Sequence, residues 1–598
     1  MAGGGIEAVS GCIAIGYNAL SSNSGGTGSG NENIAIGDSS MLYMEGTRNV
    51  SLGSDTLYTA SSADDNVAVG HQALYFNTTA DLNTAIGAYA LKANTTGGSN
   101  VAVGGYSLDA NTTGSSNTSV GAYSLGANTT ANNNTAVGYT ALQVNTTGAN
   151  LTAVGANALV ANTTGGDNTA VGAYALDANT TGEKNTAVGQ NALTQATTGD
   201  RNTAIGNYSM ADAVVTGNQN TAVGDNSLRE LTSGTLNTAL GCQSLYNNTT
   251  GNNNVAVGYN ALHNNTTADD NTGIGYAAGD AITTGYANTL LGRHAGGGIS
   301  TGHENVAIGV NALDAVTTGN DHVAVGYGAL GALTTGARMT AVGYAAGANN
   351  TTGGDNCFVG YDAGVQVTTA SSITLVGTYA GDSLTTGGNT TCLGYNAGHQ
   401  ATTNGQNTFI GSNAGNSVTT GTNNTMVGYN VGLADHSNAV VLGRDCTSIG
   451  SEHVTIGNNS SGRVYNDFAT NATWTRSSDR RWKKDINTND NCGLNFINDL
   501  RTVTYKWIAP SERPPEMTGY NPEETEPSRK EKMYGFIAQE VKESLDKHNI
   551  SNFNGWTEGE DGLQGVSYEM FVIPLVKAVQ ELSAKNEALE ARLAALES

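Results

Sequence analysis

Residues 476–486 read RSSDRRWKKDI and place a serine and a lysine at a spacing that could support nucleophilic catalysis. The hydroxyl of Ser478 is a weak nucleophile until a base takes its proton, and a neutral Lys483 could be that base. Burial beside Trp482 and repulsion from the neighbouring cations would both favour the neutral lysine. A turn or a first helical coil must bring the two side chains together. The pattern therefore predicts a Ser–Lys nucleophilic site.

The same residues allow other interpretations. The SSD tripeptide could cap a helix, with the following cations forming its solvated first turn. Within the catalytic interpretation, Ser477 could act as the nucleophile in place of Ser478, and Lys484 could compete with Lys483 as the base. The residues alone leave these alternatives open.

The RSSDRRWKKDI segment lies at a sharp change of composition. All six prolines lie at Pro510 or later, and all four tryptophans lie at Trp474 or later. Residues 1–476 carry 10 Lys and Arg against 29 Asp and Glu, whereas residues 477–598 carry 15 against 21. An acidic surface repels phosphate, so we expect neither part to bind nucleic acid. The composition indicates two different parts joined at this point.

The first part is a regular repeat. One unit reads NTAVGAYALDANTTGEK, and its first residue recurs at Asn168, Asn185 and Asn202, which are 17 residues apart. The glycine that closes the NTAVG element occurs 27 times, from Gly16 to Gly457. A period this short and regular suits one coil of a β-solenoid.

Each coil is expected to contain two short strands, one at NTAVG and one at AYAL, closed by a turn at NTTG. Asparagines at equivalent positions would stack along the axis, each amide bonding to the next. Histidines at this position, His322 and His453, are interpreted as substituted ladder residues. Small inward side chains favour three coils packed around a common axis. The fold class predicted is mainly β, a trimeric parallel β-roll or β-solenoid.

Two resemblances follow from these motifs. The NTAVG element resembles the NSVAIG repeats in the heads of trimeric autotransporter adhesins, which implies a trimeric β-roll shaft over residues 33–457. The segments SDRRWKKDI, YGFIAQEV (residues 534–541) and the run from Tyr568 to Leu582 that ends in QEL resemble the C-terminal intramolecular chaperone auto-processing domain. That domain occurs in phage tail spikes and fibres of the endosialidase type and in the myelin-regulatory-factor family.

The second resemblance implies a function for residues 477–598. Such a domain trimerises, aligns the upstream chains and then releases itself by cutting one peptide bond. Its motif order, Ser-Asp-x-x-x-Lys, implies that Ser478 is the nucleophile, Lys483 the general base and Asp479 an orienting residue. The bond cut would be Ser477–Ser478. This self-cleaving serine peptidase activity is the only catalysis expected, and the shaft is predicted to be non-enzymatic.

The C-terminus predicts oligomerisation independently. Apolar residues alternate spacings of four and three with one polar position, which is a heptad seam typical of a coiled coil over residues 575–598. A helix packed on its own domain remains an alternative. The seam consists of Leu575, Val579, Leu582, Asn586, Leu589, Leu593 and Leu596.

Other classes of site are not indicated. The six cysteines are scattered singly, which favours neither a zinc site nor a disulfide framework. We expect no metal and no cofactor. The N-terminus lacks a secretory signal pattern, and no apolar run is long enough to span a membrane, so no membrane insertion is expected. Residues 1–32 are interpreted as an N-terminal cap or attachment segment and residues 458–476 as a neck.

Together these patterns predict a homotrimeric tail fibre or spike of a virion, made in the host cytoplasm, that attaches to a host. Its expected partners are a surface receptor, either glycan or protein, and other tail or adaptor proteins of the virion. One alternative is a bacterial or other extracellular trimeric adhesin, which would need a secretion signal and an anchor. Another is a polysaccharide depolymerase tail spike, which would need a carboxylate-lined groove or an inserted domain.

Overall fold

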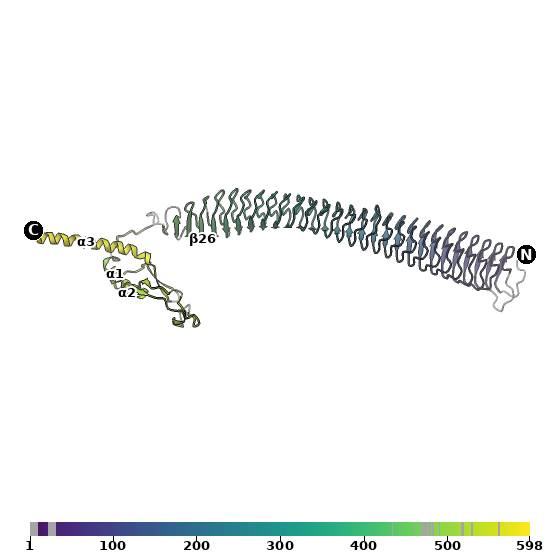
Figure 1. The fold of residues 1–598 in the computed structure, drawn as a ribbon, viewed down its shortest axis with the longest axis horizontal. Coiled ribbons are helices and arrows are strands. Elements are labelled where there is room, and N and C mark those ends of the chain that lie inside the picture. The colour runs from purple at the N-terminus through teal and green to yellow at the C-terminus, as the bar shows by residue number, and fades with distance from the viewer. Residues whose placement is uncertain are drawn as a thin grey trace. The chain divides into compact units, whose positions relative to one another are not determined.

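The chain forms two compact units, Met1–Ser477 and Ser478–Ser598, shown as ribbons in Figure 1. This computed structural model describes residues 10–21, 31–432, 434–460, 462–467, 475–476, 480, 483–489, 491–515, 520–527, 530–559 and 562–597. The first unit is a long parallel β-solenoid, and the second is a small unit of helices and short strands that ends in a long helix. The mainly β fold with a 17-residue repeat, predicted from the sequence, is confirmed.

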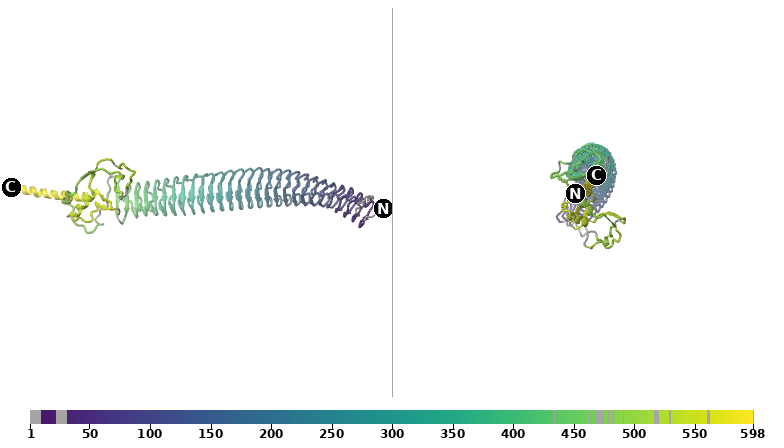
Figure 2. Two further views of the ribbon diagram at one scale, coloured as in Figure 1. Left: turned by 90° about the horizontal axis from the view of Figure 1, so that it is seen from below. Right: turned by 90° about the vertical axis from the view of Figure 1, so that its left-hand side faces the viewer.

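Each coil of the solenoid contributes one strand that pairs in parallel with the equivalent strand of the next coil. Thr169 pairs with Thr186, for example, and Ala170 with Ala187. The strands lie side by side along the unit (Figure 2). We call the coils from β1 to β27 the shaft. Their bounds are β1 Ile13–Ile15, β2 Ile34–Ile36, β3 Val50–Leu52, β4 Val67–Val69, β5 Thr84–Ile86, β6 Val101–Val103, β7 Thr118–Val120, β8 Thr135–Val137, β9 Thr152–Val154, β10 Thr169–Val171, β11 Thr186–Val188, β12 Thr203–Ile205, β13 Thr221–Val223, β14 Thr238–Leu240, β15 Val255–Val257, β16 Thr272–Ile274, β17 Thr289–Leu291, β18 Val306–Ile308, β19 Val323–Val325, β20 Thr340–Val342, β21 Cys357–Val359, β22 Thr374–Val376, β23 Thr391–Leu393, β24 Thr408–Ile410, β25 Thr425–Tyr429, β26 Val440–Arg444 and β27 His453–Asn458.

The prediction of a second strand in each coil was wrong. The AYAL segment is a series of turns, because alternate residues adopt left-handed backbone: φ is +59° at Tyr174 and +52° at Leu176. Its amides still bond from coil to coil, as in the 3.0 Å bond from the Leu176 N–H to the Ala192 carbonyl. A left-handed leucine costs about 1–2 kcal/mol. Full burial of its side chain, worth about 1.5–3 kcal/mol, offsets that cost.

The glycine after each strand is required by the approach of the next coil. All 27 of these glycines have positive φ, such as +142° at Gly172. A Cβ on Gly172 would lie 2.3 Å from the carbonyl oxygen of Gly189. Any side chain at this position would therefore push neighbouring coils apart.

The expected asparagine ladder is present. The N–H of Asn185 donates to Oδ1 of Asn168 at 2.8 Å, and Nδ2 of Asn168 donates to the Gly182 carbonyl at 2.7 Å. His322 continues the ladder, because its N–H donates to Oδ1 of Asn305 and its Nδ1 accepts from the N–H of Met339. These bonds satisfy buried amides that would otherwise each cost about 1–3 kcal/mol.

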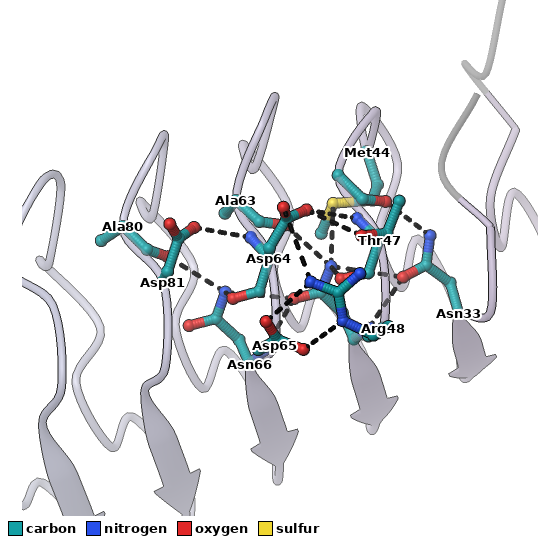
Figure 3. A network of polar contacts seen from close by, with 12 residues as sticks. Asn33, Met44, Thr47, Arg48, Ala63, Asp64, Asp65, Asn66, Ala80 and Asp81 are labelled. Atoms are coloured by element: carbon teal, nitrogen blue, oxygen red, sulfur yellow. Dashed lines mark hydrogen bonds and ion pairs between the residues drawn. The ribbon is translucent and has the colours of Figure 1, made fainter. Parts of the chain in front are cut away.

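Aspartates make a second set of bonds between coils on the outer turns near the N-terminal end of the shaft (Figure 3). Asp64 accepts from the N–H of Thr47 at 2.6 Å, and Asp81 accepts from the N–H of Asp64 at 2.7 Å. Arg48 forms a two-bond ion pair with Asp65 in the next coil, and this pairing lowers the pKa of the Asp65 carboxyl. The charges of these coils therefore lie on the turns.

The small residues fill the interior of each chain's own coil, so their size does not by itself require three coils around a common axis. Ala170, at the strand centre, and Leu176, in the turn, are both fully buried within the single chain. In some later coils the strand centre holds the large side chain and the turn position holds the small one. Gly347 and Gly364 take the leucine position on either side of Phe358, whose ring carbons lie 2.5 and 2.8 Å from where their Cβ atoms would be. The core volume stays nearly constant, because glycine replaces the turn leucine where a larger residue replaces the strand alanine.

Acid should weaken the shaft at His322. Burial lowers the pKa of this imidazole from 6.5 to about 4, so between these values only the unfolded chain binds the proton. The stability of the neutral ring is complete above pH 6.5 and falls by about 3 kcal/mol as the pH drops toward 4. His322→Asn restores a ladder amide that does not titrate. Its melting temperature, followed by circular dichroism, should fall less on acidification than that of the unmodified chain, and equal falls would contradict this account.

The parallel ladder ends in an antiparallel pair. β27 pairs with β28 (Gly462–Asp467), which pairs in turn with β29 (Thr475–Arg476). The segment interpreted as a neck thus adds two strands to the sheet of the shaft. At the other end, β1 lies within residues 1–32 and pairs in parallel with β2.

The second unit is built around a small aromatic core. Phe496, Val541, Leu545 and Phe571 are buried together with Cys492, and Phe536, Phe553 and Trp556 pack against them. Its elements are α1 Leu494–Asp499, β30 Val503–Tyr505, η2 Pro510–Glu512, β31 Met533–Gly535, α2 Ala538–Lys547, β32 Trp556–Glu558, β33 Gln564–Val566, η3 Tyr568–Phe571 and α3 Val572–Glu597.

Candidate functional site

The predicted catalytic site is only partly within the described structure. Ser477, Ser478 and Asp479 lie outside the described residues, as does Trp482, so the distance between nucleophile and base stays a prediction. Lys483 is described: it is exposed, and its N–H donates to the Arg480 carbonyl at 3.1 Å.

A chain segment connects Lys483 to the core of the second unit. The segment 483–488 is exposed or turn-like, and Asn489 then closes a turn by accepting from the N–H of Cys492 at 3.1 Å. Cys492 is buried in the aromatic core. Lys483 therefore lies a short distance in sequence before the core of the second unit.

Glu581 joins α1 to the terminal helix α3, a role that was not predicted from the sequence. Its Oε2 accepts from the N–H of Leu494 at 2.8 Å, which satisfies an orphan donor at the start of α1. Gly493 leaves room for this contact, because a Cβ there would lie 2.6 Å from the carboxylate. The glutamate of the QEL run thus ties α3 to the segment that follows Lys483. The run itself was the only signal in the sequence.

The YGFIAQEV motif and Tyr568 meet in the fold. The N–H of Phe536 donates to the hydroxyl oxygen of Tyr568 at 3.2 Å, and the two rings stack with centroids 5.7 Å apart. Gly535 permits this approach, since a Cβ there would lie 2.1 Å from the Tyr568 hydroxyl. Together with Tyr505, Trp507 and other neighbours, these rings line an open groove of about 420 Å³. Two motifs that lie far apart in the sequence therefore form one surface.

Gly535→Ala should destabilise the second unit, because the new methyl group displaces Tyr568 and breaks its bond to Phe536. The expected cost is about 1–3 kcal/mol. All four tryptophans lie at Trp474 or later, so tryptophan fluorescence during urea unfolding reports this region. Tyr568→Phe removes the atom that clashes, so the double variant should lose less than the sum of the two single losses. Strict additivity would show that the two residues do not meet.

Surface ion pairs hold α2 in place. Arg501 pairs with Glu540 through two bonds, and this contact lowers the pKa of the Glu540 carboxyl. Asp499 pairs with Lys547 and His548, which lower its carboxyl pKa in the same way. All these groups lie near the surface, where such pairs orient elements and add little stability.

The heptad seam of α3 is uncovered in the single chain. Pro574 and Ala578 are buried against the rest of the unit. The apolar seam residues, by contrast, are all exposed: Leu575, Val579, Leu582, Leu589, Leu593 and Leu596. The seam therefore does not pack on its own domain, which was the alternative considered from the sequence.

Other kinds of site are not found in the part of the chain that the structure describes. Its residues contain no cluster of three His, Cys, Asp or Glu side chains that could hold a metal ion. None of the described helices has both the length and the apolar character needed to cross a membrane. Cys242, Cys357, Cys392, Cys446 and Cys492 are free thiols.

One comparison with known proteins identifies a family resemblance. The sequence model of the family described as "Chaperone of endosialidase" matches residues 478–550. The match begins at the predicted nucleophile and includes the YGFIAQEV motif, but it ends before Tyr568 and α3. This segment is similar to an endosialidase chaperone. No curated protein and no solved structure matches the chain.

Proposed function

We propose that the chain is the shaft of a viral tail fibre or tail spike, made as a homotrimer and attached to a host surface receptor. Its C-terminal unit is an intramolecular chaperone that brings three chains together in register and then releases itself. The release is autoproteolysis of the Ser477–Ser478 bond, with Ser478 as nucleophile, Lys483 as general base and Asp479 as an orienting residue.

One coincidence carries this proposal. The boundary between the two compact units, the first residue of the endosialidase-chaperone match and the Ser-Asp-x-x-x-Lys motif all fall at residue 478. A cut at that position would separate a complete solenoid from a complete folding unit. The exposed seam of α3 supports self-association of the second unit.

The proposed reaction needs only groups that the chain supplies. The Ser478 hydroxyl gives its proton to neutral Lys483 while its oxygen attacks the carbonyl carbon of Ser477. The C–N bond breaks, and the departing amine of Ser478 takes up the proton. Water then hydrolyses the resulting ester. Lys483 is exposed in the single chain, so a neighbouring copy would have to shield it from bulk solvent until the ester has formed, and one water molecule must then reach the ester.

Two observations weigh against the polysaccharide depolymerase alternative. A polysaccharide depolymerase needs a catalytic pair of carboxylates, whereas the turn carboxylates in Figure 3 are used in bonds between coils. The 17-residue ladder also runs from β2 to β25 without an inserted domain. Shortening of host polysaccharide by the purified shaft would overturn the non-enzymatic assignment.

The attachment role is tested on particles. Antibodies raised against the shaft should label the tails of intact virions in electron micrographs and should block adsorption to host cells. Labelling of bacterial envelopes in the absence of virus would instead support the adhesin alternative.

A further inference from the structure

Strands β2 to β24 leave one face uncovered, and that face carries no charge. In β2 to β24 the middle residue of each strand points inward and is buried, whereas the first and third residues point outward. The third residue is Val, Ile or Leu in every one of these strands, and no strand residue is charged. Many of these outward side chains are exposed, including Leu52, Ile86, Val120, Val171, Ile205, Leu240, Leu291, Val342 and Leu393.

We call this surface the strand face. Stacked strands of three residues at about 3.3 Å each give a width of about 10 Å, and the 23 strands from β2 to β24 at about 4.8 Å give a length of about 110 Å. The product is on the order of 1,100 Å², which exceeds the roughly 800 Å² that each partner buries in a standard interface. The first residue is Thr in most of these strands, so the face is uncharged with one apolar side chain on every strand. A large exposed surface of this kind is typical of an interaction surface.

The spacing of the strand face restricts what can cover it. A partner must match the coil rise along the whole strand face, which stays regular even at the extra residue before Gly224, because β12 and β13 remain paired there. A second copy of the chain in the same orientation and register meets this condition at every coil. The charged residues stay on the turns, as in the pairs Arg48–Asp65 and Arg338–Asp355, so they do not oppose the approach of two strand faces.

We propose that the strand face is the surface through which the three shafts contact one another, in parallel and in register. The proposal rests on the homotrimer of the proposed function and adds the surface that holds it. The small residues inside each coil then play no part in the threefold contact. The first and third residues of the strands make that contact, and the turns face solvent.

Matched lysine substitutions test the strand face in the full-length chain. Val171 and Leu240 lie on the strand face with 37% and 47% exposure, whereas Val144 and Leu236 lie in turns with 41% and 51% exposure. Val171 is matched with Val144, and Leu240 with Leu236. Within each match, lysine replaces the same residue type at a site that is exposed in the single chain. Sedimentation equilibrium measures the concentration at which the assembly dissociates.

Val171→Lys and Leu240→Lys should raise that concentration on the order of tenfold or more, because each places three uncompensated charges in an apolar contact. Val144→Lys and Leu236→Lys should leave it unchanged. Equal effects at strand and turn, or a larger effect at the turn, would overturn the strand face as the interface. A monomeric unmodified chain would instead overturn the trimer of the proposed function, so the two failures are distinguishable.

Cysteine substitutions provide a second test, which remains valid even if the lysine variants do not fold. Val171→Cys and Val144→Cys are compared in a chain whose partly exposed native cysteines, Cys12, Cys242 and Cys357, are replaced by serine. A short bifunctional maleimide should join Val171→Cys chains into covalent dimers and should leave Val144→Cys chains single. Crosslinks at 144 and none at 171 would overturn the proposal.

Discussion

Replacing Ser478 with alanine should leave the chain as a single full-length polypeptide of 60.9 kDa. The unmodified chain should give two bands on denaturing electrophoresis, one ending at residue 477 and one spanning residues 478–598. The effect is large because the proposed mechanism has no other nucleophile: without the serine oxygen, no acyl intermediate forms. The loss of cleavage should be complete on the timescale of expression.

Neighbouring residues supply the matched controls for this result. Lys483→Ala should also abolish cleavage, whereas Lys484→Ala and Ser477→Ala should retain it. Loss with Lys484→Ala and retention with Lys483→Ala would reassign the base. If both the unmodified chain and Ser478→Ala remain full length, the second unit is a retained trimeriser and the dyad is wrong.

Deleting residues 478–598 from the gene should prevent assembly of the shaft. Successive coils are almost identical, so two strand faces can pair one coil out of register at little cost. The size exchanges that distinguish coils, such as Phe358 between its two glycines, are buried inside one chain and cannot correct a slip between chains. The truncated product should aggregate or sediment as a mixture of species.

The control for the truncated product is the same polypeptide, residues 1–477, produced by cleavage of the full-length chain. Shaft released from the full-length chain should remain a single trimeric species after the small fragment is removed, because out-of-register pairing then requires separation of the whole contact. Ser478→Ala should also assemble, since it keeps the second unit. Correct assembly of the truncated chain would show that the second unit is not needed for register.

Much of the fold was predictable because one 17-residue pattern is repeated many times. Asn168, Asn185 and Asn202 indicated both the period and the ladder. The single strand per coil was not predictable, because the left-handed backbone at Leu176 is an unusual state for leucine and its sequence signal resembles that of a strand. The inward alanines do not by themselves indicate a trimer, because small residues fit the narrow interior of one coil whether or not three coils pack around a common axis.

The candidate site was predictable in part and for a different reason. Ser478 and Lys483 are close in sequence and belong to one motif, so their pairing could be proposed without a structure. The contact of Glu581 with Leu494 spans 87 residues, and that of Tyr568 with Phe536 spans 32. Neither contact has a local pattern that specifies its partner, so only the folded chain shows them.

The position of the cut tests the account most directly. The small fragment from the unmodified chain is isolated, and its first residues are determined by mass spectrometry. Autoproteolysis by the proposed dyad gives a fragment that begins at Ser478 and reads SDRRWKKDI. A fragment that begins elsewhere, or a chain that stays intact after it has assembled, would contradict it.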